Sequence, residues 1–131
     1  MELELINKLK NESVNSTCKK HKHSAAIFDK NNIFSIGFNH YINGDLMTLH
    51  AEIHAISRLP RDLIYGKWIM VIRVNTKSEL KNSRPCNECI DKLKKKGIKK
   101  VFYSNDDGKI IIEIVNDMKY IHTSYRNRKV K

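Results

Sequence analysis

The sequence predicts an α/β fold in which a single mixed five-stranded sheet is covered by helices. Stretches with helical spacing alternate with short β-prone runs, in the order α-β-β-α-β-α-β-β. The run over residues 68–74 is continuously apolar up to Arg73, as expected for a buried central strand. A tight turn at 105–108 separates the last two strands, whereas a parallel crossover needs about a dozen residues or more. We therefore expect these two strands to be antiparallel.

The first half of the chain predicts a helix, a β-hairpin and a second helix. Apolar residues recur at helical spacing from Leu3 and again from Leu49, and Pro60 lies just past the end of the second helix. Between the helices, two apolar runs flank a polar Lys-Asn-Asn turn, which is the pattern of a hairpin. The expected bounds are 2–11 for the first helix, 24–29 and 33–38 for the hairpin strands, 40–47 for a loop and 48–58 for the second helix.

The second half predicts the central strand, a third helix and a terminal hairpin. Pro85 is suited to open a helix, and Gly97 is suited to end one. A short helix is expected to begin the C-terminal tail. The expected bounds are 68–74 for the central strand, 75–84 for a polar loop, 86–96 for the third helix, and 98–103 and 110–115 for the last strands. The length suits one compact domain, so we expect residues 1–131 to form a single domain.

Composition excludes several classes of protein. No apolar run approaches the roughly 18 residues needed to cross a bilayer. The N-terminus lacks the basic and apolar regions of a secretory signal, so we expect a soluble, cytoplasmic protein. The net charge of +11 suggests a nucleotide or nucleic-acid partner. Lysine outnumbers arginine 19 to 6, however, which compositional drift toward AT-rich codons would also produce.

Four residues in two short motifs carry the chemistry. His50-Ala51-Glu52 lies in the second predicted helix, and Pro85-Cys86-x-x-Cys89 opens the third. One imidazole and two thiolates are a sound set of zinc ligands, and three protein ligands leave a fourth position for water, as in catalytic zinc sites. Zinc lowers the pKa of bound water toward neutrality, and Glu52 is the nearby candidate for a proton shuttle. Residues i and i+2 lie about 200° apart on a helix, so only a helix N-terminus lets His50 and Glu52 both reach the site.

These motifs resemble the zinc site of the cytidine/deoxycytidylate deaminase superfamily, whose signature is H-x-E…P-C-x-x-C. The resemblance covers roughly residues 24–115 and implies a cytidine deaminase-like fold with one Zn²⁺ per chain. It implies that His50, Cys86 and Cys89 bind zinc and that Glu52 shuttles protons. It further implies substrate contacts, from the backbone N–H groups of the motifs and from a few flanking residues. These substrate-contacting residues are Asn39, Ala51 and Pro85.

Each assignment has a simpler alternative. The three ligands would also suit a purely structural zinc, and Asn39 is a common turn residue that would shape the exit of the hairpin. His54 lies one helical turn after His50, but the metalloprotease pattern needs Glu directly after the first His, so we expect a pocket-wall or surface residue. Cys18 with the histidines after it is a weak second metal candidate, since the surrounding lysines would oppose a cation.

Basic residues at both ends are candidates for phosphate or nucleic-acid contacts. One group precedes the first strand, and the other interleaves aromatic and basic residues in the tail, which suits base stacking with phosphate contact. A solvated loop and a disordered tail are the simpler interpretations. The candidates are Lys19, Lys20, Lys22, His23, Tyr125 and Arg126.

The resemblance implies a zinc-dependent hydrolase that converts cytosine to uracil in a cytidine or deoxycytidine nucleoside or nucleotide. The alternatives are a deaminase that edits cytosine or adenine in RNA or single-stranded DNA, and a zinc-stabilised binding module. His50 resembles the nucleotide and adenosine deaminases, whereas the tight turn at 105–108 resembles the free-nucleoside enzymes, so the substrate stays open. We expect a small-molecule substrate, no membrane partner and a homo-oligomer.

Overall fold

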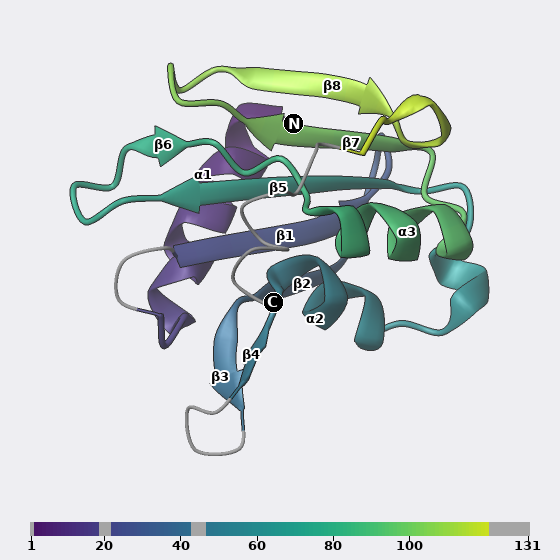
Figure 1. Cartoon of the computed structure of the whole chain (residues 1–131), viewed down its shortest axis with the longest axis horizontal. Coiled ribbons are helices and arrows are strands. Elements are labelled where there is room, and N and C mark those ends of the chain that lie inside the picture. The colour runs from purple at the N-terminus through teal and green to yellow at the C-terminus, as the bar shows by residue number, and fades with distance from the viewer. Residues whose placement is uncertain (1, 19–21, 43–46, 121–131) are drawn as a thin grey trace, which may run out of the picture.

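The computed structural model describes residues 2–18, 22–42 and 47–120 of the chain. Its main sheet has the strand order β2-β1-β5-β7-β8, with β6 pairing to β5 off this path (Figure 1). The central pair, β5 and β7, is parallel, and the other neighbours are antiparallel. The strands are β1 (Lys22–Phe28), β2 (Ile33–Phe38), β5 (Trp68–Val74), β6 (Leu80–Lys81), β7 (Lys100–Ser104) and β8 (Ile110–Ile114). The mixed sheet and the antiparallel terminal hairpin confirm the predicted fold class.

Helices cover both faces of the sheet. In Figure 1, α2 and α3 lie on the near face and α1 lies behind. Each face has its own apolar core: one joins α2 and α3 to the sheet, and the other joins Leu5 and Leu9 of α1 to Met70 and Ile72 of β5. The helices are α1 (Glu2–Glu12), α2 (Ala51–Ser57) and α3 (Asn87–Lys96), and short 3₁₀ turns cover Ser13–Asn15, Arg61–Leu63 and Val115–Asp117 (η3). None of these described helices is long and apolar enough to cross a membrane.

The segment before α2 differs from the sequence prediction. Residues 40–47 were expected to be a loop, but β3 (His40–Ile42) and β4 (Met47–Leu49) form a separate two-stranded ribbon. Leu49 pairs with His40 in this ribbon, so the expected helix start at residue 48 is wrong and α2 begins at Ala51. Strands of three residues are too short to show a period-two pattern, and the Asn-Gly-Asp turn signal dominates this stretch of sequence.

Smaller differences concern the ends of elements. The expected loop at 75–84 contains the two-residue strand β6, which is too short to predict from sequence. The third helix ends where expected: Gly97 adopts the left-handed conformation with φ 78° and stops α3. The start of the tail forms the short 3₁₀ turn η3.

A close contact places α2 on the sheet. A Cβ added to Gly37 of β2 would lie 2.4 Å from the backbone nitrogen of Ala55 and 2.7 Å from the carbonyl oxygen of Ala51. Only glycine allows the backbone of α2 to lie this near β2. The first turn of α2 is thereby fixed over β2 and β1, on the side of the sheet where β2 forms the edge.

Candidate zinc and catalytic site

The three predicted ligands lie at the N-terminal ends of two helices. His50 is the residue before α2 and has extended backbone angles, φ −72° and ψ 149°. Cys86 holds the same position before α3, and Cys89 lies in its first turn. Residues at these boundary positions point back toward what precedes the helix, so His50, Cys86 and Cys89 converge although 36 residues separate the first two.

The geometry of this group fits zinc. His50 Nδ1 lies 3.2 Å from Cys89 Sγ and 3.7 Å from Cys86 Sγ, and all three ligand atoms lie within 4.8 Å of one another. A tetrahedral zinc with bonds of about 2.0–2.3 Å separates its ligand atoms by roughly 3.5 Å. Among the described residues this is the single group of three or more such side chains that is close enough to hold a metal ion.

The two thiols differ in how easily each loses its proton. A hydrogen bond from Cys89, supported by the nearby His50, lowers the pKa of Cys86 to about 4. The same hydrogen bond, together with burial, raises the pKa of the Cys89 thiol. The thiolate is the form of cysteine that binds a metal ion, so a pair in which one thiol readily loses its proton is suited to bind a cation. Cys89 is buried and His50 is exposed, so the group opens to solvent on the histidine side.

Glu52 lies beside this group without belonging to it. Its side chain is 5 % exposed, and burial raises the pKa of its carboxyl group above the usual range. The carboxyl interacts with His50, Cys86 and Cys89, yet the close group of candidate ligands leaves it out. As the sequence required, the N-terminus of α2 lets both His50 and Glu52 face the site. The arrangement offers a metal site with a buried carboxyl at its side.

Comparison with known proteins agrees with this geometry. The model of the family described as "Cytidine and deoxycytidylate deaminase zinc-binding region" matches residues 2–105. The chain belongs to the cytidine and deoxycytidylate deaminase family. It is therefore a zinc-dependent hydrolytic deaminase, and the group of His50, Cys86 and Cys89 fits its zinc. No curated protein matches the sequence.

Solved structures of this deaminase fold are similar at low sequence identity. A cyanophage S-TIM5 dCMP deaminase is 24% identical with a TM-score of 0.60, over 81% of this chain and 86% of that one. A cytidine deaminase from Burkholderia pseudomallei is 18% identical with a TM-score of 0.67, over 89% and 94% of the two chains. A cytidine deaminase from Mycobacterium leprae is 18% identical with a TM-score of 0.59, over 84% and 89%. These likenesses confirm the predicted fold.

The other residues expected to contact substrate in this deaminase lie near the motifs. Ala51 and Pro85 are buried next to the ligands His50 and Cys86. Asn39 is buried at the end of β2, where its Oδ1 accepts hydrogen bonds from the Ser16 hydroxyl (2.6 Å) and the His23 backbone N–H (2.9 Å). Asn39 thus joins the end of β2 to Ser16 and to the start of β1, in agreement with the turn-shaping alternative. Its contact with a substrate stays a prediction.

His54 has a structural role in the described chain. Its Nδ1 accepts a hydrogen bond from the Phe38 N–H at 3.1 Å, and its ring packs edge-on against the rings of Phe38 and His40. Burial, with Arg58 and His40 nearby, lowers the pKa of His54. A neutral ring that accepts at Nδ1 fits a wall residue, as expected, and not a ligand. The weak second metal candidate includes His21, which lies outside the described residues.

The basic candidates are only partly described. Lys22 begins β1 and donates to the Ser16 carbonyl at 2.9 Å, and His23 follows it next to Asn39. Lys19, Lys20, Tyr125 and Arg126 lie outside the described residues. Phosphate contacts by any of these side chains stay predictions.

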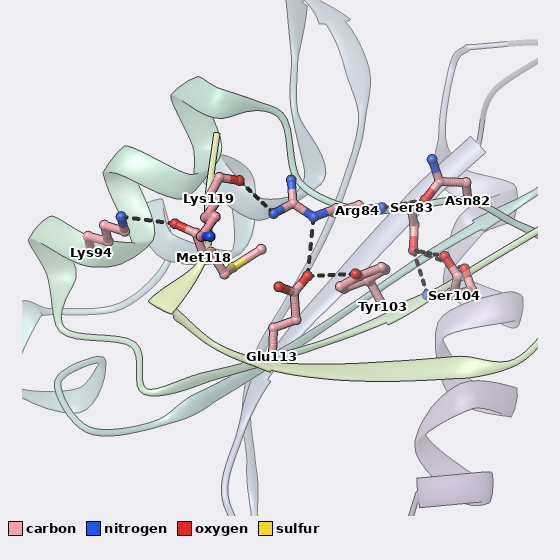
Figure 2. Close-up of polar contacts among 9 residues, drawn as sticks. All are labelled: Asn82, Ser83, Arg84, Lys94, Tyr103, Ser104, Glu113, Met118 and Lys119. Carbon is pink, nitrogen blue, oxygen red and sulfur yellow. Dashed lines mark hydrogen bonds and ion pairs between the residues drawn. The ribbon is translucent and has the colours of Figure 1, made fainter. Parts of the chain in front are cut away.

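A polar network beside the site was not foreseen from the sequence. Figure 2 shows Arg84 between the Glu113 carboxylate of β8 and the Lys119 carbonyl, with Tyr103 also donating to Glu113. Ser83, one residue earlier, donates to the Val71 carbonyl at 2.7 Å. Arg84 directly precedes the Pro-Cys motif, but nothing in the sequence pairs it with a carboxylate 29 residues away.

Proposed function

We propose that this deaminase converts cytosine to uracil in a cytidine or deoxycytidine nucleoside or nucleotide, with release of ammonia. The observation that carries the proposal is Glu52, a buried carboxyl with a raised pKa that lies against the candidate zinc ligands. A purely structural zinc site has no need of such a group, so the carboxyl separates the enzyme from a zinc-stabilised binding module.

Each residue then has a distinct role. His50, Cys86 and Cys89 would hold the zinc, which when bound activates water at neutral pH. Glu52 would take a proton from the attacking water and pass it to the ring nitrogen of the base. It would then take the proton of the newly added hydroxyl group and deliver it to the amino group, which leaves as ammonia when the bond from carbon to that nitrogen breaks and the carbonyl of the product forms. A raised pKa suits a carboxyl that must both accept and give protons near neutral pH.

Contacts with the rest of the substrate are assigned to the residues around the motifs. The backbone N–H groups of Ala51 and Cys86 would orient the base, and Pro85 would wall the pocket beside it. The Asn39 amide would face the sugar while its oxygen keeps its two internal hydrogen bonds. A homo-oligomer is part of the same proposal.

A second candidate is a deaminase that edits a base in RNA or single-stranded DNA. The net charge of +11 favours it, because a polyanion is attracted to a basic surface. The two candidates respond differently to salt. Nucleic-acid binding weakens steeply as salt rises, whereas binding of a nucleoside barely changes.

The test is an ammonia-release screen on the zinc-loaded protein. The substrates are cytidine, deoxycytidine, their monophosphates, adenosine, guanine and short single-stranded oligonucleotides. We expect release from at least one of the small cytosine compounds. Release from oligonucleotides alone, with turnover that falls steeply with salt, would replace the proposal by the editing function. Activity on adenosine or guanine alone would overturn the choice of base.

A further inference from the structure

The loop that leads into α3 places Arg84 two residues before the predicted zinc ligand Cys86. The residue between them is Pro85, whose ring fixes its own φ and disfavours helical backbone angles at Arg84. Cys86 is itself extended, with φ −70° and ψ 168°, and α3 begins directly after it. The link from Arg84 to Cys86 is therefore stiff, so a shift of Arg84 would move the thiol as well.

Before Arg84, the loop is attached to the ends of the central strands through Ser83. The Ser83 N–H donates to the Ser104 carbonyl of β7 at 2.8 Å, and the Ser83 hydroxyl donates to the Val71 carbonyl of β5 at 2.7 Å. Both serines are buried, so water does not compete for these hydrogen bonds. A single anchored residue fixes one point of the loop, but it does not fix the direction in which the chain continues toward Cys86.

The Arg84 side chain supplies a second attachment, to the terminal hairpin. Its Nε pairs with the Glu113 carboxylate of β8 at 3.1 Å, and its Nη2 donates to the Lys119 carbonyl at 2.7 Å (Figure 2). Tyr103 of β7 donates to the same carboxylate oxygen at 2.6 Å, so the acceptor is held in place too. The side chains of the ion pair are 13 % and 30 % exposed, and a pair partly shielded from water is stronger than a fully exposed one.

Of the two cysteines in the zinc group, Cys86 depends more on this loop. Cys89 lies within the first turn of α3 and is buried, whereas Cys86 precedes the helix and is half-buried. The Sγ atom of Cys86 lies 3.7 Å from His50 Nδ1, against 3.2 Å for the Sγ atom of Cys89. Bonds from zinc to sulfur are about 2.3 Å long and vary by only about 0.2 Å, so a small displacement of this thiol would weaken its bond to the metal.

We propose that Arg84 is a positioning residue for the zinc site: by pairing with Glu113 it holds the loop so that Cys86 Sγ stays within bonding distance of the metal. Arg84 is not a ligand and acts through the stiff Pro85–Cys86 link. The zinc group is thereby coupled to β8, an edge strand that carries none of the three ligands. The inference concerns the metal site alone, so it holds for whichever base the enzyme deaminates.

The test measures metal binding by the full chain, without any substrate. Competition with a chromophoric chelator gives the Kd of zinc, and the visible spectrum of the cobalt-loaded protein reports how its thiolates bind the metal. The variants are Arg84→Gln, Arg84→Lys, Glu113→Gln, and the double variant with both glutamines. The matched control is Ser13→Ala, which removes the hydrogen bond from a buried hydroxyl to the Lys10 carbonyl (2.6 Å) at the end of α1, on the other face of the sheet. The unfolding midpoint is measured in every chain.

We expect Arg84→Gln to raise the Kd of zinc about tenfold and to weaken the thiolate-to-cobalt absorption, as when a residue that supports a metal ligand is lost. Arg84→Lys keeps the charge but not the planar fork of donors, so it should recover part of the loss. Glu113→Gln keeps an acceptor and should have a smaller effect, and it keeps the test valid if Arg84→Gln folds poorly. The double variant should equal Arg84→Gln alone, because both residues act through one pair. Ser13→Ala should lower the unfolding midpoint and leave the cobalt spectrum unchanged.

Several results would overturn the inference. Wild-type zinc affinity and cobalt spectrum in Arg84→Gln would leave Arg84 no role in the site. A higher Kd with an unchanged spectrum, matched by Ser13→Ala at an equal loss of unfolding midpoint, would make the effect one of stability alone. Additive losses in the double variant would show that the two residues act separately. A wild-type chain that binds no zinc would overturn the inference together with the metal site, whereas the expected zinc results without ammonia release from any compound would overturn the proposed function alone.

Discussion

Burial raises the pKa of the Glu52 carboxyl, as its proposed role as a proton shuttle requires. The carboxyl lies at the second position of α2, where the preceding His50 is extended and Ala51 is buried, so its side chain turns inward beside the thiols. Removal from water raises its pKa, and the nearby His50 only partly offsets this. A carboxyl on the solvent face of the same helix would hold its proton far too weakly to serve as an acid near neutral pH.

Glu52→Gln should keep the fold and the zinc but lose activity. The amide has nearly the same shape and cannot carry a proton between water and the base. General acid–base groups contribute roughly 10²–10⁴-fold, so ammonia release on the true substrate should fall by about that factor. Turnover close to wild type, with zinc content confirmed by elemental analysis, would show that another group shuttles the protons.

The ligand set predicts one zinc per chain, bound through one nitrogen and two sulfurs. X-ray absorption on the metal-replete protein measures this directly. Cys86→Ser should lose the zinc and lower the unfolding midpoint, because the energy of metal binding is linked to folding. Cys18→Ser is the control: Cys18 is buried away from the group and should leave the zinc in place. A shell of four sulfurs, or full zinc occupancy in Cys86→Ser, would contradict the assignment.

The individual zinc ligands could be predicted from the sequence, because all three lie in two short motifs. The contacts of Asn39 and Arg84 were not predictable in the same way. Asn39 hydrogen-bonds Ser16, 23 residues earlier, and Arg84 pairs with Glu113, 29 residues later. Such contacts depend on the order of the strands in the sheet, and that order cannot be deduced from the spacing of residues along the chain.

The helices serve the site through their N-terminal ends. Both α2 and α3 begin at a ligand, so the position of each helix on the sheet sets the position of a donor atom. The close contact at Gly37 determines the position of α2 on the sheet. The loop from Ser83 to Cys86, which is hydrogen-bonded to Val71 of β5 through Ser83, determines the position of α3. The helices and the central strand were predictable because their apolar patterns are long. The β3–β4 ribbon and β6 were not, since their strands have only two or three residues each.

Gly37→Ala should destabilise the fold and weaken zinc binding together. The added methyl group would meet the backbone of Ala55 and Ala51, which cannot rotate away, so α2 must shift and take His50 with it. Overpacking of this kind costs about 1–3 kcal/mol. Gly108→Ala is the control: it lies in the β7–β8 turn with open space around it but has a φ of +79°, so it should destabilise the fold through backbone strain and leave zinc affinity unchanged. Urea unfolding and a zinc titration check both; equal zinc affinity in Gly37→Ala would contradict the coupling.

The Tyr103–Glu113 contact makes stability depend on alkaline pH. Burial, and then the hydrogen bond to Glu113, raises the pKa of Tyr103 above its usual 10.0. The unfolded chain therefore loses this proton first, and the contribution to stability is full below pH 10 and is lost as pH rises through the folded-state pKa. Tyr103→Phe should cost about 1 kcal/mol at pH 8 and less at pH 11, measured by urea unfolding. An unchanged difference at the two pH values would show that the phenol does not titrate in the folded state.

At the scale of the whole molecule, the two faces of the sheet are covered unequally. On one face, α2 and α3 extend the core as far as Val101 and Val115. On the other, α1 packs against β1, β2 and β5, while Ile112 and Ile114 of β8 lie 53 % and 45 % exposed beside Phe102 and Lys100. An edge strand with exposed isoleucines is a surface to which another chain can bind. The sequence showed that these residues form a strand, but not which part of the sheet the first helix would leave open.

The protein should therefore self-associate through β8. Burying the two isoleucines against a second copy removes apolar area from water, and the antiparallel edge offers backbone groups to a partner. Multi-angle light scattering at micromolar concentration should give a mass above 15.3 kDa. The double variant Ile112→Lys, Ile114→Lys should shift the mass toward the monomer, because it places like charges on both copies. Leu3→Lys, at an apolar position on α1 that is 71 % exposed, should leave the mass unchanged. A wild-type mass equal to one chain would refute the association, and an oligomer that survives the double variant would place the interface elsewhere.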